Sequence, residues 1–169
     1  MLFNIGLRNL MDKVMNQFAI SFAAFCTAGQ KRNESTTRSI ETARQWCLRN
    51  GYTLEQYPEQ EDTRISAVPG SSVILGCLHL VQHRLERGYI APGTVLILEA
   101  LNGIPLEARA SAISLLMGFM LNGLALVTLR DGKFWNPAAP ENFGQFVMSV
   151  VSMFDDEPES GAAEAQAEL

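Results

Sequence analysis

Short uncharged runs alternate along this chain with segments of helical periodicity. The runs span residues 18–26, 94–98 and 124–129, and apolar side chains dominate all three. Continuous apolar runs of this length are typical of strands that are covered on both faces of a sheet. Strands that alternate with helices form parallel sheets with helices packed on them, so the order predicts an α/β fold with a mainly parallel central sheet flanked by helices.

The segments between these runs carry helix and turn signals. Segment 38–50 stops at Gly51, a favoured residue just past a helix end, and Ser71 can cap a helix that ends near Gly88. The other expected elements are helices over 107–121 and 142–154, loops over 31–37 and 58–70, a weak strand over 52–57, and a short hairpin strand that begins at Phe134-Trp135 after the Asp131-Gly132 turn.

The length of 169 residues favours one domain, which we place at residues 16–154. Residues 1–15 form an N-terminal extension, expected to be a short amphipathic helix that carries Leu7 and Leu10. Met15 is an alternative start. Residues 155–169 are small and acidic, which predicts a disordered tail that is either simply solvated or binds a partner.

The net charge of -5 comes from this tail. It holds six of the 18 carboxylates, which leaves 12 against 13 lysines and arginines in the rest of the chain. A body this close to neutral has no evident basic stripe for a phosphate backbone, so we expect little or no direct DNA binding.

The three cysteines are odd in number and show no CxxC spacing. This pattern predicts reduced thiols and a cytoplasmic setting. Residues 110–129 lack charges, but Asn122-Gly123 interrupts them, so a helix, a turn and a buried strand are expected here and no membrane span.

Two segments resemble the active-site motifs of the serine recombinase catalytic domain. Residues 22–30 lie at the end of the first apolar run, where that family has Tyr-Ala-Arg-Val-Ser, and residues 98–106 come at the end of the second, where it has Asp-Arg-Leu-Ser-Arg. Residues 39–52, 92–99 and 127–133 resemble further helices, strands and turns of the family in the same order. The resemblance implies a resolvase-like three-layer fold over roughly residues 17–157.

The chain departs from the family at the positions that carry its chemistry. Cys26 matches the nucleophilic serine and Ala24 its arginine, and only Gln30 is unchanged. Asn102, Gly103 and Leu106 match the aspartate and two arginines of the second motif. The family's last active-site arginine falls in an acidic stretch with a proline, and its long helix and DNA-binding domain have no counterpart. Phosphodiester exchange needs cations on the phosphoryl oxygens, so the resemblance implies an inactive member.

Other signals leave alternatives open. His79 and His83 are four residues apart, which could hold a metal, but no third ligand accompanies them, so no metal or cofactor is expected. The Asn102-Gly103 pair is either a turn or part of a small-ligand site at the strand carboxyl ends. Phe134-Trp135 is either a core and hairpin element or an exposed anchor.

We therefore expect a catalytically inactive recombinase-like protein that serves a phage or other mobile element as a protein-interaction or regulatory module. Its partner would be a repressor or an active recombinase, and a homo-oligomer is the other assembly left open. The candidate contact residues are Phe134, Trp135, Leu7 and Leu10. The alternatives are an enzyme that uses Cys26 for phosphoryl transfer or DNA nicking, and a small-ligand binder.

Overall fold

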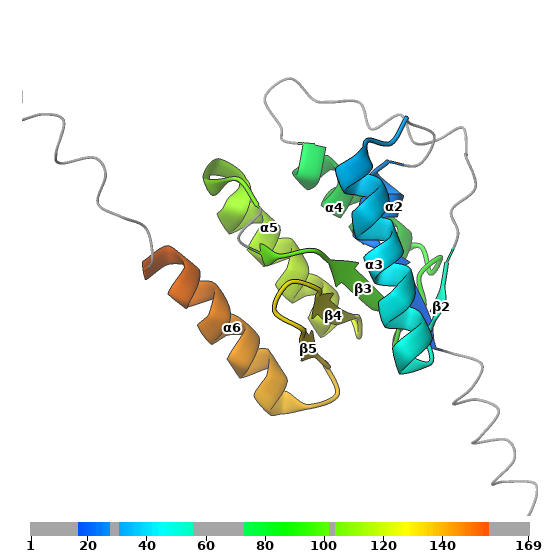
Figure 1. The fold of residues 1–169 in the computed structure, drawn as a ribbon. Helices are drawn as coiled ribbons and strands as arrows, with labels where there is room; N and C mark the ends of the chain where they lie inside the picture. The colour runs from blue at the N-terminus through cyan, green and yellow to red at the C-terminus, as the bar shows by residue number, and fades with distance from the viewer. Residues whose placement is uncertain (1–16, 28–30, 56–72, 102–103, 156–169) are drawn as a thin grey trace, which may run out of the picture.

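A computed structural model describes residues 17–27, 31–55, 73–101 and 104–155, and side chains throughout these ranges except at 140 and 153–155. The chain forms an α/β domain of three layers, with a five-stranded sheet between helices (Figure 1). The strands are β1 (Phe18–Ser21), β2 (Thr53–Leu54), β3 (Val95–Leu98), β4 (Ala125–Thr128) and β5 (Lys133–Trp135), and the helices are α2 (Phe22–Cys26), α3 (Glu34–Asn50), α4 (Val73–Glu86), α5 (Leu106–Leu121) and α6 (Pro140–Asp155).

The strand order across the sheet is β2-β1-β3-β4-β5. The first four strands pair in parallel, whereas β5 returns antiparallel to β4 with Trp135 opposite Leu126. Since parallel neighbours need crossover connections, α3 links β1 to β2 and α5 links β3 to β4. The expected mainly parallel sheet and the expected hairpin are both confirmed.

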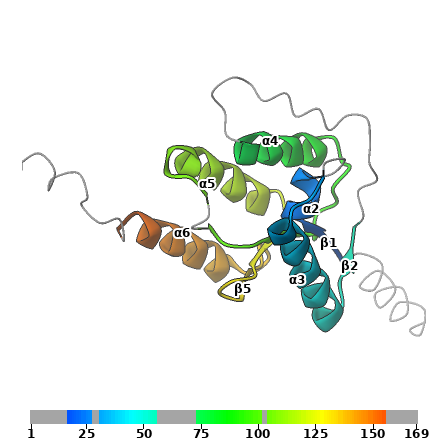
Figure 2. The same cartoon turned by 45° about the horizontal axis from the view of Figure 1, so that its top comes forward.

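Both faces of the sheet are buried, as the uncharged runs predict. On one face Ile20, Leu96 and Leu126 pack in the larger core, to which α2, α4, α5 and α6 contribute side chains. Their neighbours along the strands point the other way, and Ala19 and Val95 pack in a smaller core with α3. Figure 2 shows α3 on the side of the sheet opposite to α4 and α5.

The first uncharged run is a strand for only half its length. β1 ends at Ser21, and residues 22–26 form the short helix α2, so the expectation of a strand up to Cys26 is wrong. The turn into helix follows from Ser21 itself, whose hydroxyl accepts a hydrogen bond from the backbone N–H of Ala24 at 3.2 Å. Hydrophobicity alone does not separate a buried strand from a buried helix.

Helix α3 and strand β2 differ in length from the helix and strand that the sequence predicts. Helix α3 begins at Glu34, inside the expected loop over 31–37, because the Asn33 side chain caps the Thr36 N–H at 2.8 Å. Strand β2 is confined to Thr53–Leu54. The expected end of α3 at Gly51 is confirmed, and this glycine takes a left-handed φ of 75° that L side chains rarely adopt.

The uncharged stretch 110–129 divides between α5 and β4, as expected, with a turn at Asn122-Gly123. Within the described residues no helix has the length and hydropathy to cross a bilayer. The expectations for residues 1–16, with Leu7, Leu10 and Met15, for Ser71, for the loop over 58–70 and for the tail from 156 onward fall outside the described residues.

Candidate functional site

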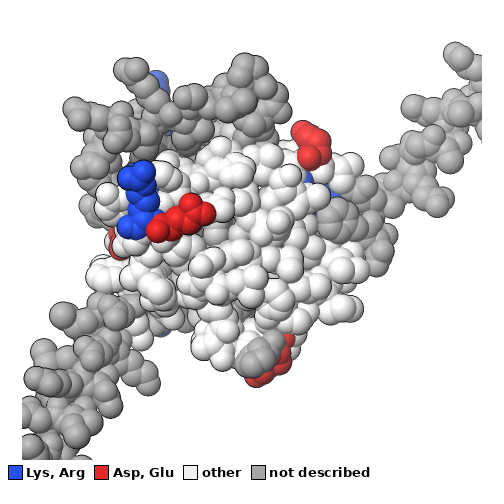
Figure 3. Space-filling view, turned by 180° about the vertical axis from the view of Figure 1, so that it is seen from behind, with Lys and Arg blue, Asp and Glu red and all other residues white. Residues whose placement is uncertain are grey.

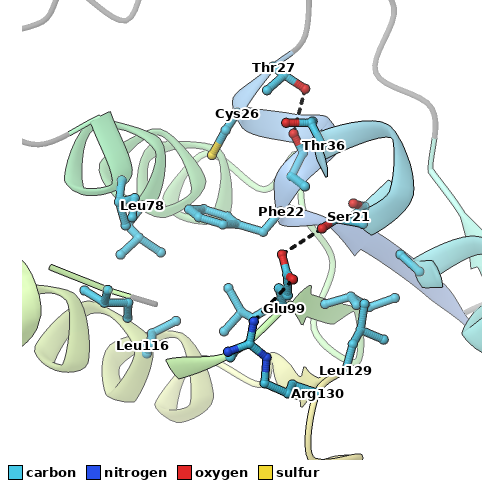
Figure 4. A pocket seen from close by; sticks show the side chains of 18 residues that line it. Ser21, Phe22, Cys26, Thr27, Thr36, Leu78, Glu99, Leu116, Leu129 and Arg130 are labelled. Carbon is cyan, nitrogen blue, oxygen red and sulfur yellow. Dashed lines mark hydrogen bonds and ion pairs between the residues drawn. The ribbon is translucent and has the colours of Figure 1, made fainter. Parts of the chain in front are cut away.

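A cavity of about 320 Å³ lies where the carboxyl ends of β1, β3 and β4 meet α2, α3, α4 and α5 (Figure 4). Ligands of open α/β sheets commonly bind at this edge. Most of the lining is apolar, and the polar groups gather where Glu99 and Arg130 leave the sheet. The lining includes Ser21, Phe22, Cys26, Ser39, Leu78, Glu99, Ala100, Ile104 and Arg130.

The cavity brings the two motif segments to one sheet edge. Cys26, the last residue of α2, lines it, and so do Ala100 and Ile104, which belong to the second motif segment and stand on either side of Asn102-Gly103. Gln30, Asn102 and Gly103 are not among the described residues. Ala24 is half-buried on α2, and Leu106 is 53% exposed at the start of α5; neither lines the cavity.

One carboxylate and one guanidinium form the charged part of the described lining. Glu99 accepts a hydrogen bond of 2.7 Å from the Ser39 hydroxyl through Oε2, and its Oε1 lies 3.7 Å from Nη2 of Arg130. Both side chains of the ion pair are more than half exposed, at 62% for Arg130 and 56% for Glu99, so solvent weakens their attraction. Arg130 is the one cation that the described residues place in the cavity lining, and it already faces a carboxylate.

Sequence reasoning missed the Ser39–Glu99–Arg130 contact. Ser39 and Glu99 are 60 residues apart in sequence, and no spacing rule connects a helix surface to a strand end over that distance. The sequence signal that could have pointed to this contact is the position of Glu99, which directly follows a buried strand at the sheet edge where ligands commonly bind.

The thiol of Cys26 lies beside that of Cys77 on α4. Hydrogen bonding with Cys77, followed by burial, raises the pKa of Cys26 above its ordinary range. The same hydrogen bond lowers the pKa of Cys77. Cys26 therefore holds its proton and is a poor nucleophile at neutral pH, because the thiolate is the reactive form. All three cysteines are free thiols, as expected from their number and spacing.

His79 and His83 have no further metal-ligating side chains clustered with them in the described part of the chain. Both histidines are exposed on α4. The arrangement offers two nitrogens on a solvated helix face, which is fewer ligands than zinc sites in proteins use.

A second hollow lies between β5 and α6, with a volume of about 640 Å³. Phe134 and Met148 line it and remain 38% and 64% exposed. Trp135 is only 2% exposed, because its ring packs edge-on against Phe146 at 5.3 Å between centroids. Of the two alternatives for Trp135, the structure therefore shows the core element and not the exposed anchor, whereas Phe134 is partly exposed and stacks on Trp46.

Comparison with known proteins yields an uncharacterized relative. The chain is 29% identical over 118 residues to the uncharacterized protein YbcK of Escherichia coli (strain K12), a match that covers 70% of this chain. It spans 23% of the length of that relative. No family model matches the chain. No solved structure matches it either.

Proposed function

We propose that this chain is a catalytically inactive serine recombinase-like domain that acts as a protein-interaction module of a phage or other mobile element. The observation that carries the proposal is the cavity at the sheet edge where the two motif segments meet. Its described lining holds a protonated thiol at Cys26 and a single guanidinium, Arg130, which faces Glu99.

The charge of this cavity is unsuited to phosphoryl transfer. The reaction places negative charge on the phosphoryl oxygens, and enzymes stabilise that charge with several positioned cations. Removing one such donor commonly lowers the rate by about 10²-fold or more. The one arginine of the described lining, which already faces Glu99, therefore supports the inactive alternative over the Cys26 enzyme.

The hollow between β5 and α6 is the surface that we assign to the partner. It combines exposed apolar side chains, Phe134 and Met148, with the opposite charges of Lys133 and Glu141 at its border. Apolar or aromatic anchors with a polar rim are the usual composition of protein interfaces. A phage repressor or an active recombinase encoded by the same element is the partner to test.

Co-purification of the tagged chain with the repressors and recombinases of its own element tests this proposal. We expect the wild-type protein and the Cys26→Ala variant to retain the partner and Met148→Ser to lose it. Leu48→Ser is the matched control, because Leu48 is 70% exposed on α3, away from the hollow. Each variant is checked for folding by circular dichroism. Loss of the partner with Cys26→Ala alone would sink the interaction model.

A small-ligand binder is the second candidate, and the size and lining of the cavity favour it. A volume of about 320 Å³ lies in the range of small-molecule pockets, and its apolar wall ends in a few polar groups, as ligand sites do. Native mass spectrometry of the gently purified chain tests this candidate. A retained small molecule that is lost with Leu78→Trp, which fills the cavity, would favour the binder.

A further inference from the structure

The apolar cavity at the sheet edge borders a smaller, polar hollow with a volume of about 210 Å³. Four residues line both spaces, namely Ser39, Glu99, Leu129 and Arg130. The rest of the described lining of the hollow comes from polar side chains of α3, which are Ser35, Arg38 and Thr42. The carboxylate of Glu99 and the guanidinium of Arg130 therefore lie on the border between an apolar and a polar space.

The backbone positions both of these charged residues. Glu99 directly follows β3, and Arg130 comes two residues after the end of β4. The backbone N–H of Arg130 donates to the carbonyl oxygen of Glu99 at 3.0 Å, and that of Leu129 donates to the carbonyl oxygen of Leu98 at 2.9 Å. The pairing of the two strands thus continues past their ends, and the two side chains of opposite charge start from neighbouring, hydrogen-bonded backbone.

Both charged groups keep capacity for a ligand. A guanidinium and a carboxylate each form several hydrogen bonds. Nη2 of Arg130 lies 3.7 Å from Oε1 of Glu99, which is longer than a hydrogen bond, and the Ser39 hydroxyl donates to Oε2. Both side chains of the pair are more than half exposed. A ligand with one charge of each sign can therefore reach both groups.

We propose that the cavity binds a free apolar α-amino acid, whose side chain enters the apolar space while its carboxylate contacts Arg130 and its ammonium contacts Glu99. An α-amino acid carries both charges on one carbon, which suits a guanidinium and a carboxylate that lie 3.7 Å apart. This assignment rests on the small-ligand candidate given above, whose ligand it names by chemical class.

The charges of the described lining favour a zwitterion over a simple ion. A carboxylate without an ammonium would place negative charge beside Glu99, and an amine without a carboxylate would place positive charge beside Arg130. Like charges brought together in this way oppose binding. A zwitterion pairs with both groups at once.

The apolar wall selects the side chain of the ligand. Phe22, Leu78 and Leu116 line the cavity, and Figure 4 shows them on one side of the Glu99–Arg130 pair. Burial of an apolar side chain against such a wall is favourable, whereas burial of a polar one without partners costs free energy. Leucine and phenylalanine are therefore the ligands to test, and aspartate and lysine are the polar controls.

Isothermal titration calorimetry of the full chain at neutral pH tests the proposal. The probes are L-phenylalanine and L-leucine, beside analogues that lack the carboxylate (phenethylamine, 3-methylbutylamine) or the ammonium (3-phenylpropanoate, 4-methylpentanoate). We expect an apolar amino acid to bind and the loss of either charged group to weaken binding by about tenfold or more, because hydrogen bonds to charged groups contribute this much. L-aspartate and L-lysine should not bind.

Variants separate the two contacts. Glu99→Gln should weaken binding of the amino acid by about tenfold or more without weakening that of the anionic analogue, and Arg130→Gln should do the same without weakening that of the amine. Arg44→Gln is the matched control, because Arg44 is a half-exposed, ion-paired arginine of α3 that lines neither space. Leu78→Trp, which fills the cavity, should abolish binding of every probe. Circular dichroism checks the folding of each variant.

Two results with the wild-type chain would overturn the proposal, and neither needs a variant to fold. They are failure of both apolar amino acids to bind, and equal affinities for the amino acid and its two analogues. Equal affinities that Leu78→Trp abolishes, or a retained molecule of another class in native mass spectrometry, would still leave a small-ligand binder. Failure of the ligand class is thus distinguishable from failure of the candidate function, and co-purification tests the interaction module separately.

Discussion

Phe134 and Trp135 are neighbours on β5, and the pleat of the strand sends them to opposite faces of the sheet. Trp135 fills the larger core beside Phe146, and Phe134 lies on the other face, where its ring is 6.2 Å from that of Trp46. Aromatic pairs at such distances add to the free energy of burial. Trp135 therefore stabilises the fold alone, whereas Phe134 stabilises it and keeps an exposed part that a partner can contact.

Alanine substitutions should separate these two roles. Trp135→Ala removes a buried ring and should lower the free energy of unfolding by about 3–5 kcal/mol. Phe134→Ala should lower it by less, because 38% of Phe134 is exposed in the folded state and only part of its transfer from water is lost. Urea denaturation followed by tryptophan fluorescence or circular dichroism measures both. Equal losses of unfolding free energy in the two variants would contradict the conclusion that Trp135 is buried more deeply than Phe134.

The buried thiol of Cys47 makes stability depend on pH. Burial raises its pKa in the folded protein above the ordinary value of 9.0, so the folded chain keeps a proton that the unfolded chain releases. Its contribution is complete below pH 9.0 and is lost as pH rises through the folded-state pKa. Melting temperature measured above pH 9 should fall less steeply for Cys47→Ala than for the wild type. Identical slopes would show that this thiol does not titrate differently in the two states.

At the scale of the elements, capping residues decide where the helices begin. The apolar pattern predicts the three buried strands, the two long crossover helices α3 and α5, and the hairpin, because periodicity and turn residues are local signals. It does not predict that the strand changes to helix at Ser21, since residues 22–26 are as apolar as the strand before them. The same reasoning from the sequence predicts one part of the candidate site, the position of Cys26 at the sheet edge. The Ser39–Glu99 contact does not, because it joins elements that meet only in the folded chain.

Ser21 provides a direct test of the capping argument. Ser21→Ala removes the acceptor of the Ala24 N–H and should lower the free energy of unfolding by about 0.5–2 kcal/mol, while Ser21→Thr keeps a hydroxyl and should lose less. Because α2 would begin to fray, Cys26 in Ser21→Ala should also react faster with iodoacetamide under native conditions. An unchanged alkylation rate together with an unchanged stability would show that α2 does not depend on this cap.

At the scale of the whole molecule, the described surface is mainly uncharged on one side. In Figure 3 most of the visible described surface is neutral, and the blue areas lie beside red ones. Ion pairs such as Arg44–Glu41 and Arg38–Glu34 on α3 repeat this arrangement elsewhere. A protein that binds DNA gains most of its affinity from clustered lysines and arginines that displace counterions. The distribution of charge therefore disfavours a DNA-binding face on the described residues.

The purified chain should leave supercoiled plasmid DNA uncut and should show little binding to duplex DNA at physiological salt. Introducing the nucleophilic residue of serine recombinases alone, as Cys26→Ser, should not produce cleavage, because the reaction also requires cations that stabilise the charge on the phosphoryl oxygens. Gel electrophoresis of the plasmid and fluorescence anisotropy of a labelled duplex measure the two activities, with an active serine recombinase on its own site as the positive control. Cleavage by the wild-type chain that Cys26→Ala abolishes would instead establish a cysteine enzyme, in which the raised pKa of Cys26 must fall when DNA binds.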